Sequence, residues 1–319
     1  MDLSIIIVNW NTKELLKDCI KSIYKKTQNI DYEIIIVDNA SKDGSVKMLK
    51  EEFPQCITIA SKENLGFAKG NNRAIQKANG KYILFLNPDT ELKTEAIGGM
   101  INFMKENDEI GAIGCKLLNR DGSIQFTCAR KFPTPFNKFC FLTMLNRIFP
   151  TCKFVSSTEM NYWDHLDSRE VECLSGACVL TRKKIIDQVG GFDEKFFMYC
   201  EDVELCYRIK NHGWRIYYLA GEAIYHYSGA SSNQRNESYF STLLQLESNQ
   251  NFLADNCGRS KAIQFRIAVF TGSIIRIIAI ILILLGAIIY KSNKKQIAIY
   301  SIKKYFNIFL WSIRYSYYK

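Results

Sequence analysis

The chain has 319 residues, of which 47% are hydrophobic and 13% aromatic, so it can bury one large core or two modest ones and is not a disordered protein. Of its 42 basic residues, eleven lie in residues 258–319, where there is no acidic residue. The other 31 are balanced by 32 acidic residues, so the net charge of +10 belongs to the tail and excludes a uniformly basic nucleic-acid-binding protein.

The N-terminal part alternates apolar segments typical of buried strands with amphipathic segments typical of helices. Strands are predicted at residues 3–8, 32–37, 56–61 and 82–86, and helices at residues 13–25, 45–53 and 69–78. This alternation predicts an α/β fold with a Rossmann-like, mainly parallel sheet flanked by helices.

Polar residues follow each of the four predicted strands. They lie at residues 9–11, 38–39, 64–72 and 87–89. Because ligands of parallel sheets bind beyond the carboxyl ends of the strands, we expect these residues to line one crevice.

The pattern beyond residue 111 is mixed. Short strands are predicted at residues 112–118 and 173–181, and a helix begins near Glu201 and ends at residues 211–213. Residues 132–165 are irregular and aromatic. This segment is either an insertion on the side of the crevice where an acceptor would bind or a helical segment that covers the fold, and both alternatives stay open.

The tail contains two apolar stretches. Residues 268–290 are long enough to span a bilayer if Arg276 extends to the interface, and residues 297–318 mix lysines with tyrosines as interfacial segments do. Basic residues flank the first stretch on both sides, so a spanning segment and an in-plane segment both remain possible. We expect residues 1–257 to form the catalytic domain, with halves at 1–110 and 111–257, and residues 258–319 to form a membrane-associating helical tail.

The eleven cysteines are scattered and form no CxxC pair. This spacing favours buried small apolar side chains over a disulfide framework or a zinc site. It predicts a reducing compartment, which here means the cytoplasmic face of the cell membrane.

Asp89 is a candidate metal ligand. It follows an apolar strand and the dipeptide Asn87-Pro88, which is also a common turn signal. A carboxylate at a strand end suits Mg²⁺ or Mn²⁺, which bind one or two protein carboxylates and then substrate phosphates. His226 is either a second ligand to the same cation or a half-buried core histidine.

Glu201 and Asp202 are adjacent acids at the start of a predicted helix. Acids in this position ordinarily stabilise free N–H groups of the first turn. The aromatic residues at 196–199 precede them, however, and a carboxylate beside apolar walls can serve as a general base for a sugar hydroxyl.

Seven motifs occur in a fixed order over residues 3–230. They lie at residues 8–11, 36–45, 64–72, 86–89, 175–177, 190–194 and 201–205. In this order the chain resembles family 2 glycosyltransferases of GT-A fold, most closely the bacterial rhamnosyltransferase-like branch. Many relatives have Asp-x-Asp where this chain has Asn87-Pro88-Asp89, so a single carboxylate would anchor the metal.

The resemblance implies a donor site at the ends of the first strands. Asp38 would hold the base of the nucleotide, and Asn9 and Asn11 would line that pocket. The loop from Asn64 to Asn72 would close over ribose and diphosphate. The other donor-binding residues expected on the same basis are Asn39, Gly66, Lys69 and Asn87.

The resemblance also implies an inverting mechanism. Asp202 would be the general base, with Glu201 orienting it, and Asp89 and His226 would face the metal and diphosphate. Gly176 and Ala177 would lie on the acceptor side.

The expected reaction moves a sugar from a nucleotide-sugar donor, for which dTDP-rhamnose is the first choice, to a saccharide or polyprenyl-diphosphate-linked saccharide in cell-surface polysaccharide synthesis. The expected partners are Mg²⁺ or Mn²⁺ and an anionic membrane surface, with no nucleic acid. A membrane-anchored nucleotide-sugar-binding protein without transferase activity is the alternative. A dinucleotide-dependent oxidoreductase is disfavoured because no GxGxxG follows the first strand.

Overall fold

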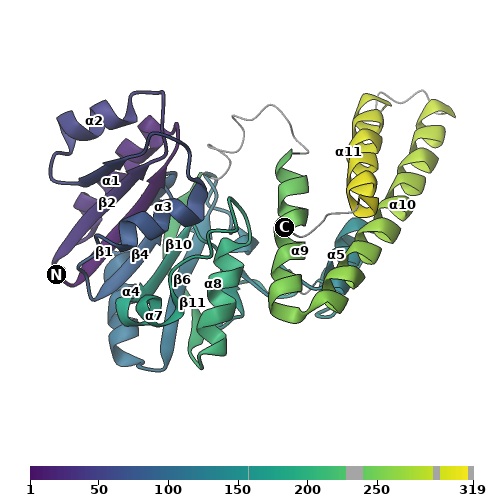
Figure 1. Cartoon of the computed structure of the whole chain (residues 1–319). Helices are drawn as coiled ribbons and strands as arrows, with labels where there is room; N and C mark the ends of the chain where they lie inside the picture. Colours follow the sequence, from purple (N-terminus) through teal and green to yellow (C-terminus); the bar gives the residue numbers. More distant parts are fainter. Residues whose placement is uncertain (157, 228–239, 290–294, 315–319) are drawn as a thin grey trace. The chain divides into compact units, whose positions relative to one another are not determined.

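The computed structural model describes residues 1–156, 158–227, 240–289 and 295–314 (Figure 1). The chain forms two compact units, each built from two separate segments. The first unit contains Met1–Phe132 and Asp164–Asn236, and the second contains Pro133–Trp163 and Glu237–Lys319. The predicted boundary at residues 257–258 therefore falls inside the second unit.

The centre of the first unit is a mixed, mostly parallel sheet of nine strands among the described residues. The path β3-β2-β1-β4-β10-β6-β11-β5 contains eight strands, and β8 (Arg169–Glu170) pairs with β11. The strands on the path, in chain order, are β1 Leu3–Asn9, β2 Tyr32–Asp38, β3 Ile57–Ala60, β4 Tyr82–Leu86, β5 Thr90–Leu92, β6 Ile110–Leu118, β10 Cys178–Arg182 and β11 Arg215–His226.

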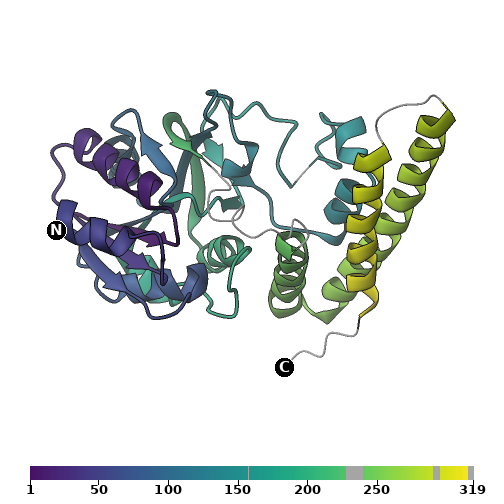
Figure 2. The same ribbon diagram turned by 90° about the horizontal axis from the view of Figure 1, so that it is seen from above.

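The strands β1 and β4 are buried along their whole length, as expected of central strands covered on both faces. Helices lie on both faces of the sheet (Figure 2). They are α1 Lys13–Lys26, α2 Ser45–Glu52, α3 Gly66–Ile75, α4 Ala96–Glu106, α7 Lys183–Val189 and α8 Glu201–Asn211. Helix α1 has Glu14 in its first turn and Lys25 and Lys26 in its last, which complements the helix dipole.

The structure refines two predicted elements. Helix α3 begins at Gly66 and not at residue 69, because the side chain of Asn64 accepts the Gly66 N–H at 2.9 Å and starts the turn early. The predicted strand 173–181 is divided into β9 (Cys173–Leu174) and β10, which runs antiparallel between β4 and β6. The strand β9 pairs instead with β7 (Ala129–Arg130) in a separate two-stranded sheet.

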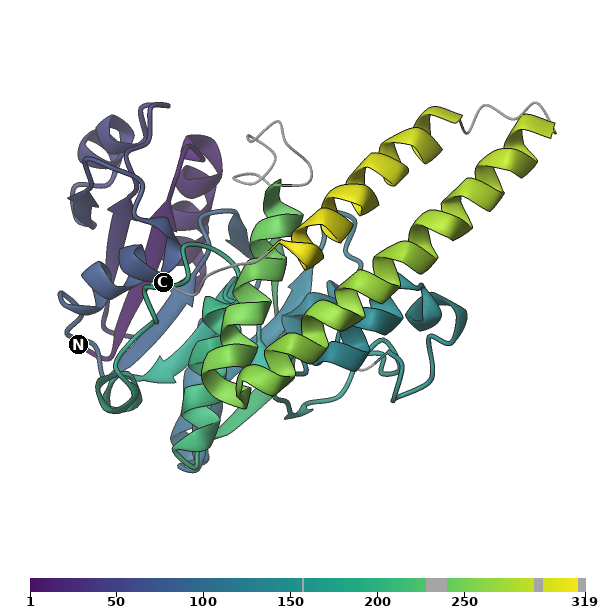
Figure 3. The same ribbon diagram turned by 45° about the vertical axis from the view of Figure 1, so that its right-hand side comes forward.

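The second unit is helical. It contains α5 Pro135–Leu142, α6 Leu145–Ile148, α9 Phe240–Cys257, α10 Arg259–Ile289 and α11 Lys295–Ile313. Helices α10 and α11 lie side by side (Figure 3), and α10 also packs against α5 and α9. At Gly272 of α10, a Cβ atom would lie 2.9 Å from Cβ of Leu142, so α5 can approach α10 only because this residue is glycine.

Within the described part of the chain, one helix is long and apolar enough to cross a membrane, judged by length and composition. It is Arg259–Leu285, with a mean hydropathy of 2.7. Only 28% of its most apolar window is buried, unlike the core helix of a globular domain, and the exposed side chains are large and apolar. On α10 they include Ile275, Ile278, Ile281, Leu282, Ile283 and Leu285.

The cysteines behave as the sequence predicts. All eleven are free thiols, and nine of them are buried. Cys115 and Cys178 lie on neighbouring strands with sulfur atoms 3.7 Å apart, too far for a disulfide bond.

Candidate active site

The ends of β1 and β2 bring Asn9 and Asp38 together, since these residues are partners in the parallel register. The Asn9 side-chain amide donates to Asp38 Oδ2 at 2.8 Å, and the Ser41 backbone N–H donates to Asp38 Oδ1 at 2.9 Å. Asp38 is 1% exposed, so its carboxylate is held in place by donors from two strand ends. The two residues thus lie side by side at the carboxyl ends of β1 and β2, and their role toward the donor's base stays a prediction.

Asn11 connects the same two loops. Its Oδ1 accepts the Lys42 backbone N–H at 2.7 Å, and its own N–H donates to Ser41 Oγ at 2.9 Å. Its positive φ of 52° is a conformation that asparagine tolerates better than most residues. Asn11 thus holds the loop after β1 against the loop after β2.

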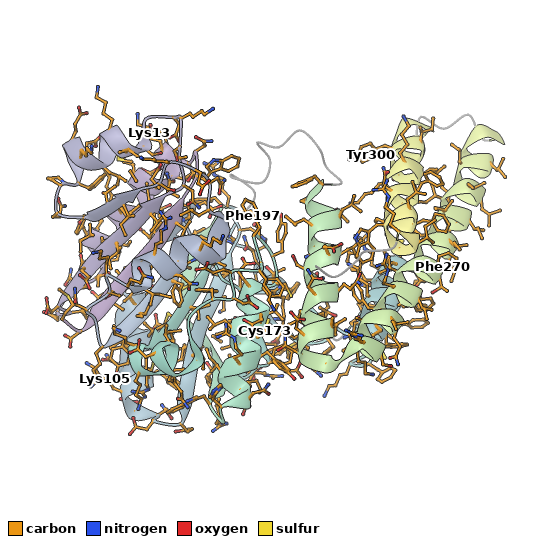
Figure 4. The ribbon with its side chains drawn as sticks, viewed as in Figure 1. Lys13, Lys105, Cys173, Phe197, Phe270 and Tyr300 are labelled. Carbon is orange, nitrogen blue, oxygen red and sulfur yellow. The ribbon has the colours of Figure 1, made fainter. Side chains whose placement is uncertain are left out.

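The start of α3 closes against the same edge. Asn39 donates its amide to the Gly66 carbonyl at 3.0 Å, and Phe67 N–H donates to the Phe197 carbonyl at 3.0 Å. A Cβ at Gly66 would lie 2.4 Å from that carbonyl oxygen. Phe197 is labelled in Figure 4, and its backbone is what makes glycine necessary at residue 66.

Asn72 and Lys69 differ in environment, although both belong to the predicted donor loop. The Asn72 amide donates to the Phe192 carbonyl at 2.9 Å and to Glu194 Oε1 at 3.0 Å, and its oxygen accepts the Phe192 N–H at 2.9 Å. Asn72 therefore fixes the segment around Phe192, whereas Lys69 is exposed.

Asp89 and His226 meet because β5 and β11 pair with His226 opposite Thr90. His226 Nε2 lies 3.4 Å from Asp89 Oδ1 and 3.4 Å from the amide nitrogen of Asn87. On the other side of the ring, Nδ1 lies 2.9 Å from Gln125 Oε1, and Gln125 also donates to the His226 carbonyl at 2.7 Å. When Nδ1 donates to Gln125, the lone pair of Nε2 points toward Asp89.

These two side chains fit a divalent cation. A carboxylate oxygen and a neutral imidazole nitrogen are both ligands that Mn²⁺ accepts, and the carboxylate alone suits Mg²⁺. Across the residues that the structure describes, no group of three or more His, Cys, Asp or Glu side chains could hold a metal. A cation here would complete its coordination with water and donor phosphates.

A short turn at residues 175–177 connects this strand end to α8. The Ala177 carbonyl accepts the Asn87 N–H at 3.0 Å, and the Gly176 N–H donates to Asp202 Oδ2 at 3.0 Å. Asp202 and Asn87, two residues before Asp89, are therefore bonded to the same turn.

Arg130 holds Asp202 from the opposite direction. Its Nη2 donates to Asp202 Oδ2 at 2.7 Å, and the two side chains are only 21% and 15% exposed. Among the residues that the structure describes, Asp202 Oδ1 accepts one hydrogen bond, from the Val203 N–H at 2.8 Å. The carboxylate is therefore anchored through Oδ2, and Oδ1 keeps a lone pair for a further proton donor.

Glu201 lies buried beside Asp202, and the orienting role that the resemblance implies for it stays a prediction. It is 7% exposed, and its Oε2 has no hydrogen-bond partner in the described structure. Burial and the neighbouring Asp202 charge raise the pKa of Glu201 to about 8, so Glu201 is mainly neutral at pH 7. The orientation of Asp202 comes from Arg130 and Gly176, and nothing in the sequence around Arg130 marks it.

A cavity of about 550 Å³ lies against His226. It is lined by Leu15, Asn119, Arg120, Asp121, His226 and Tyr227. The Arg120 guanidinium carbon lies 5.6 Å from the centre of the Tyr227 ring. A guanidinium and an imidazole at the wall of such a cavity suit an anionic ligand.

Comparison with known proteins gives a consistent result. Residues 4–190 match glycosyl transferase family 2. The chain is 25% identical over 264 residues to N-acetylglucosaminyl-diphospho-decaprenol L-rhamnosyltransferase of Mycobacterium tuberculosis, covering 79% of this chain and 84% of that protein. It is 27% identical over 260 residues to rhamnosyltransferase WbbL of Escherichia coli, covering 78% of this chain and 92% of that protein.

Solved structures show the same fold. Mannosyltransferase PcManGT from Pyrobaculum calidifontis, in complex with GDP-Man and Mn²⁺, has a TM-score of 0.59 at 13% identity, covering 98% of this chain and 88% of that chain. S. aureus TarS has a TM-score of 0.50 at 15% identity, covering 97% and 89%. The fold is GT-A, and the chain belongs to glycosyl transferase family 2, which confirms the predicted family, fold and enzyme class.

Proposed function

We propose that this family 2 glycosyltransferase transfers a hexose from a nucleotide-sugar donor to a hydroxyl group of a lipid-linked saccharide, with inversion at the anomeric carbon. The relatives act in sugar transfer, and one of them is named for a diphospho-decaprenol acceptor. The observation that carries the proposal is the turn at residues 175–177, which ties the Asp202 carboxylate to the strand end that bears Asp89.

The donor would lie along the strand ends. Asp38 and Asn9 would bind the base, Asn11 and Asn39 would shape the pocket wall, and Asn64 and Gly66 would hold the loop above ribose. A Mg²⁺ or Mn²⁺ ion held by Asp89 and His226 would neutralise the charge of the departing diphosphate. Gln125 would keep the His226 ring in the orientation that this requires.

The acceptor hydroxyl would give its proton to Asp202 Oδ1. As it does so, the acceptor oxygen forms a bond to the anomeric carbon, the bond from that carbon to the diphosphate oxygen breaks, and the nucleoside diphosphate leaves. Arg130 would keep the Asp202 carboxylate oriented, and the neutral Glu201 adds no second negative charge. Gly176 and Ala177 would form the acceptor side of the site.

We further propose dTDP-rhamnose as the donor and a polyprenyl-diphosphate-linked saccharide as the acceptor, following the names of the two relatives. The second unit would hold the enzyme on the cytoplasmic face of the membrane. The exposed apolar residues of α10 and the acid-free, basic composition of residues 258–319 support this location.

The test compares UDP-, GDP- and dTDP-sugars as donors for the wild type and for Asp202→Asn, measuring nucleoside diphosphate release and transfer. We expect one nucleotide class to be turned over by the wild type. The variant should lose about 10²- to 10⁴-fold in transfer rate, with nucleotide affinity changed by no more than a few fold. A collapse of donor binding in the variant would instead make Asp202 a structural or metal-linked residue.

A further inference from the structure

The second unit contains a cavity of its own. It has a volume of about 530 Å³ and lies among α9, α10 and α11. Its lining is Gln250, Arg259, Ala262, Ile263, Arg266, Ile267, Phe270, Ser312, Ile313 and Arg314. Phe270 is labelled in Figure 4.

The lining combines three guanidinium groups with apolar side chains. None of the lining residues is acidic, and α10 and α11 contain no acid at all. Arginine is the side chain best suited to phosphate, because its planar group donates several hydrogen bonds in a fixed geometry. The charge of this cavity therefore selects an anion.

Arg266 is already held in position. Its Nε donates to the Ser312 carbonyl at 3.2 Å and its Nη2 to the Trp311 carbonyl at 2.9 Å, with a further bond to the Arg314 carbonyl. The guanidinium also lies over the Trp311 ring, 5.2 Å from its centre. These contacts satisfy carbonyls at the end of α11 and just beyond it, and within the described part of the chain Nη1 has no bond and can reach a ligand.

The apolar part of the lining continues onto the helix surface. Ile263 and Ile267 are 58% and 56% exposed, and further along α10 the exposed series begins at Ile275. Nine residues of helix separate Arg266 from Ile275, a distance of roughly 14 Å at 1.5 Å per residue. The cavity is thus the cationic end of an apolar surface, and a ligand that fits both parts has an anionic head and an apolar chain.

We propose that this cavity binds the phosphate or diphosphate group of a lipid, whose chain lies along the exposed face of α10. Arg259, Arg266 and Arg314 bind the phosphate oxygens, and the isoleucines contact the first part of the chain. The identification of that lipid as the acceptor rests on the proposed function, whereas the phosphate-binding site does not.

The experiment uses the full chain in neutral detergent micelles. Farnesyl diphosphate is the probe, and farnesol and inorganic diphosphate are its two halves. Binding is measured by equilibrium dialysis, with Trp311 fluorescence as a local reporter. We expect farnesyl diphosphate to bind more tightly than either half, and Arg259→Gln with Arg314→Gln to weaken it about tenfold or more, because charge-assisted hydrogen bonds are lost.

The control is Lys261→Gln with Lys303→Gln, which removes the same charge from exposed positions on the same two helices, outside the cavity lining. This variant should bind the probe as the wild type does. Equal weakening in both double variants, no weakening in either, or equal affinity for farnesol would overturn the proposal.

A competition arm separates the two sources of a lipid phosphate. Displacement of the probe by a polyprenyl diphosphate but not by phosphatidylglycerol supports the acceptor. Equal displacement by phosphatidylglycerol overturns the acceptor identity and leaves an anionic phospholipid site. Donor hydrolysis, measured in parallel, should be the same for the arginine variant and the wild type. If the wild type hydrolyses no donor yet binds the probe, the proposed function fails and the lipid site stands.

Discussion

The two units differ in the side-chain interactions on which their proposed functions depend. In the first unit the proposed chemistry depends on a few buried polar side chains, and each is fixed by two or three hydrogen bonds, as Asp38 and Asp202 are. In the second unit the surface depends on composition, with many exposed apolar side chains and no acid on its two longest helices. Loss of one side chain should therefore stop the chemistry of the first unit. In the second unit, each lost apolar side chain should weaken membrane binding by a small step.

The largest effect is expected at Asp89. Asp89→Ala removes the carboxylate that lies 3.4 Å from His226 at the strand end, and donor turnover should fall by about 10³-fold or more. Nucleoside diphosphate release with added Mg²⁺ or Mn²⁺ measures it. Full activity of the wild type in excess EDTA would contradict the metal assignment.

The next effect concerns the second unit. Ile278→Glu with Leu282→Glu places two charges on positions that are 52% and 64% exposed, so packing is undisturbed. Binding to anionic vesicles should fall by about 10²-fold or more, given the cost of a charge in apolar surroundings. Vesicle sedimentation measures it. Ile57→Glu, at an exposed apolar position of the first unit, is the control and should bind normally.

A smaller effect is expected at Arg130. Arg130→Met should lower kcat by about 10- to 100-fold, the usual value of a charge-assisted hydrogen bond. Arg130→Lys, which keeps the positive charge, should restore part of kcat.

Arg208→Met is the control for stability of α8. Arg208 pairs with Glu204 on the same helix at 2.6 Å and does not contact Asp202. If this variant lowers kcat as much as Arg130→Met does, Arg130 acts only through stability of the helix.

The smallest effect is a pH dependence of stability from Glu201. Its pKa in the folded chain is raised to about 8 from 4.5, so between these values the folded chain keeps a proton that the unfolded chain has lost. The stability of the wild type should therefore fall as pH rises through this window. Glu201→Gln stays neutral, so its thermal unfolding midpoint should vary less with pH and lie several degrees above that of the wild type near pH 8. Parallel pH profiles would refute the buried neutral form.

The same comparison explains what the sequence could predict. Strand ends follow directly from the alternation of apolar and polar segments. For this reason the sequence predicts that Asn9, Asp38 and Asp89 lie at or just after the ends of parallel strands, as they do at β1, β2 and β4. Arg130 and Gln125 could not be found in this way. Their roles depend on the pairing of β7 with β9 and on a loop that reaches His226, and both contacts join residues distant in the sequence.

The helical unit shows the same limit. Apolar composition predicts α10 and α11 as helices, but the grouping of residues 133–163 with them depends on the approach of α5 to Gly272. A glycine in an apolar helix does not indicate in the sequence which helix packs against it. The antiparallel position of β10 within the sheet is likewise a property of the whole topology.

The approach of α5 to Gly272 also sets an order of events during synthesis. Leu142 leaves the ribosome about 130 residues before Gly272, which at about 5–20 residues per second is a delay of roughly 7 to 26 s. During that time the face of α5 that will cover α10 has no partner, while the chain between them must complete the sheet of the first unit. Helix α5 is thus synthesised well before α10 can cover it. In this interval its apolar face is accessible to chaperones and to the membrane surface.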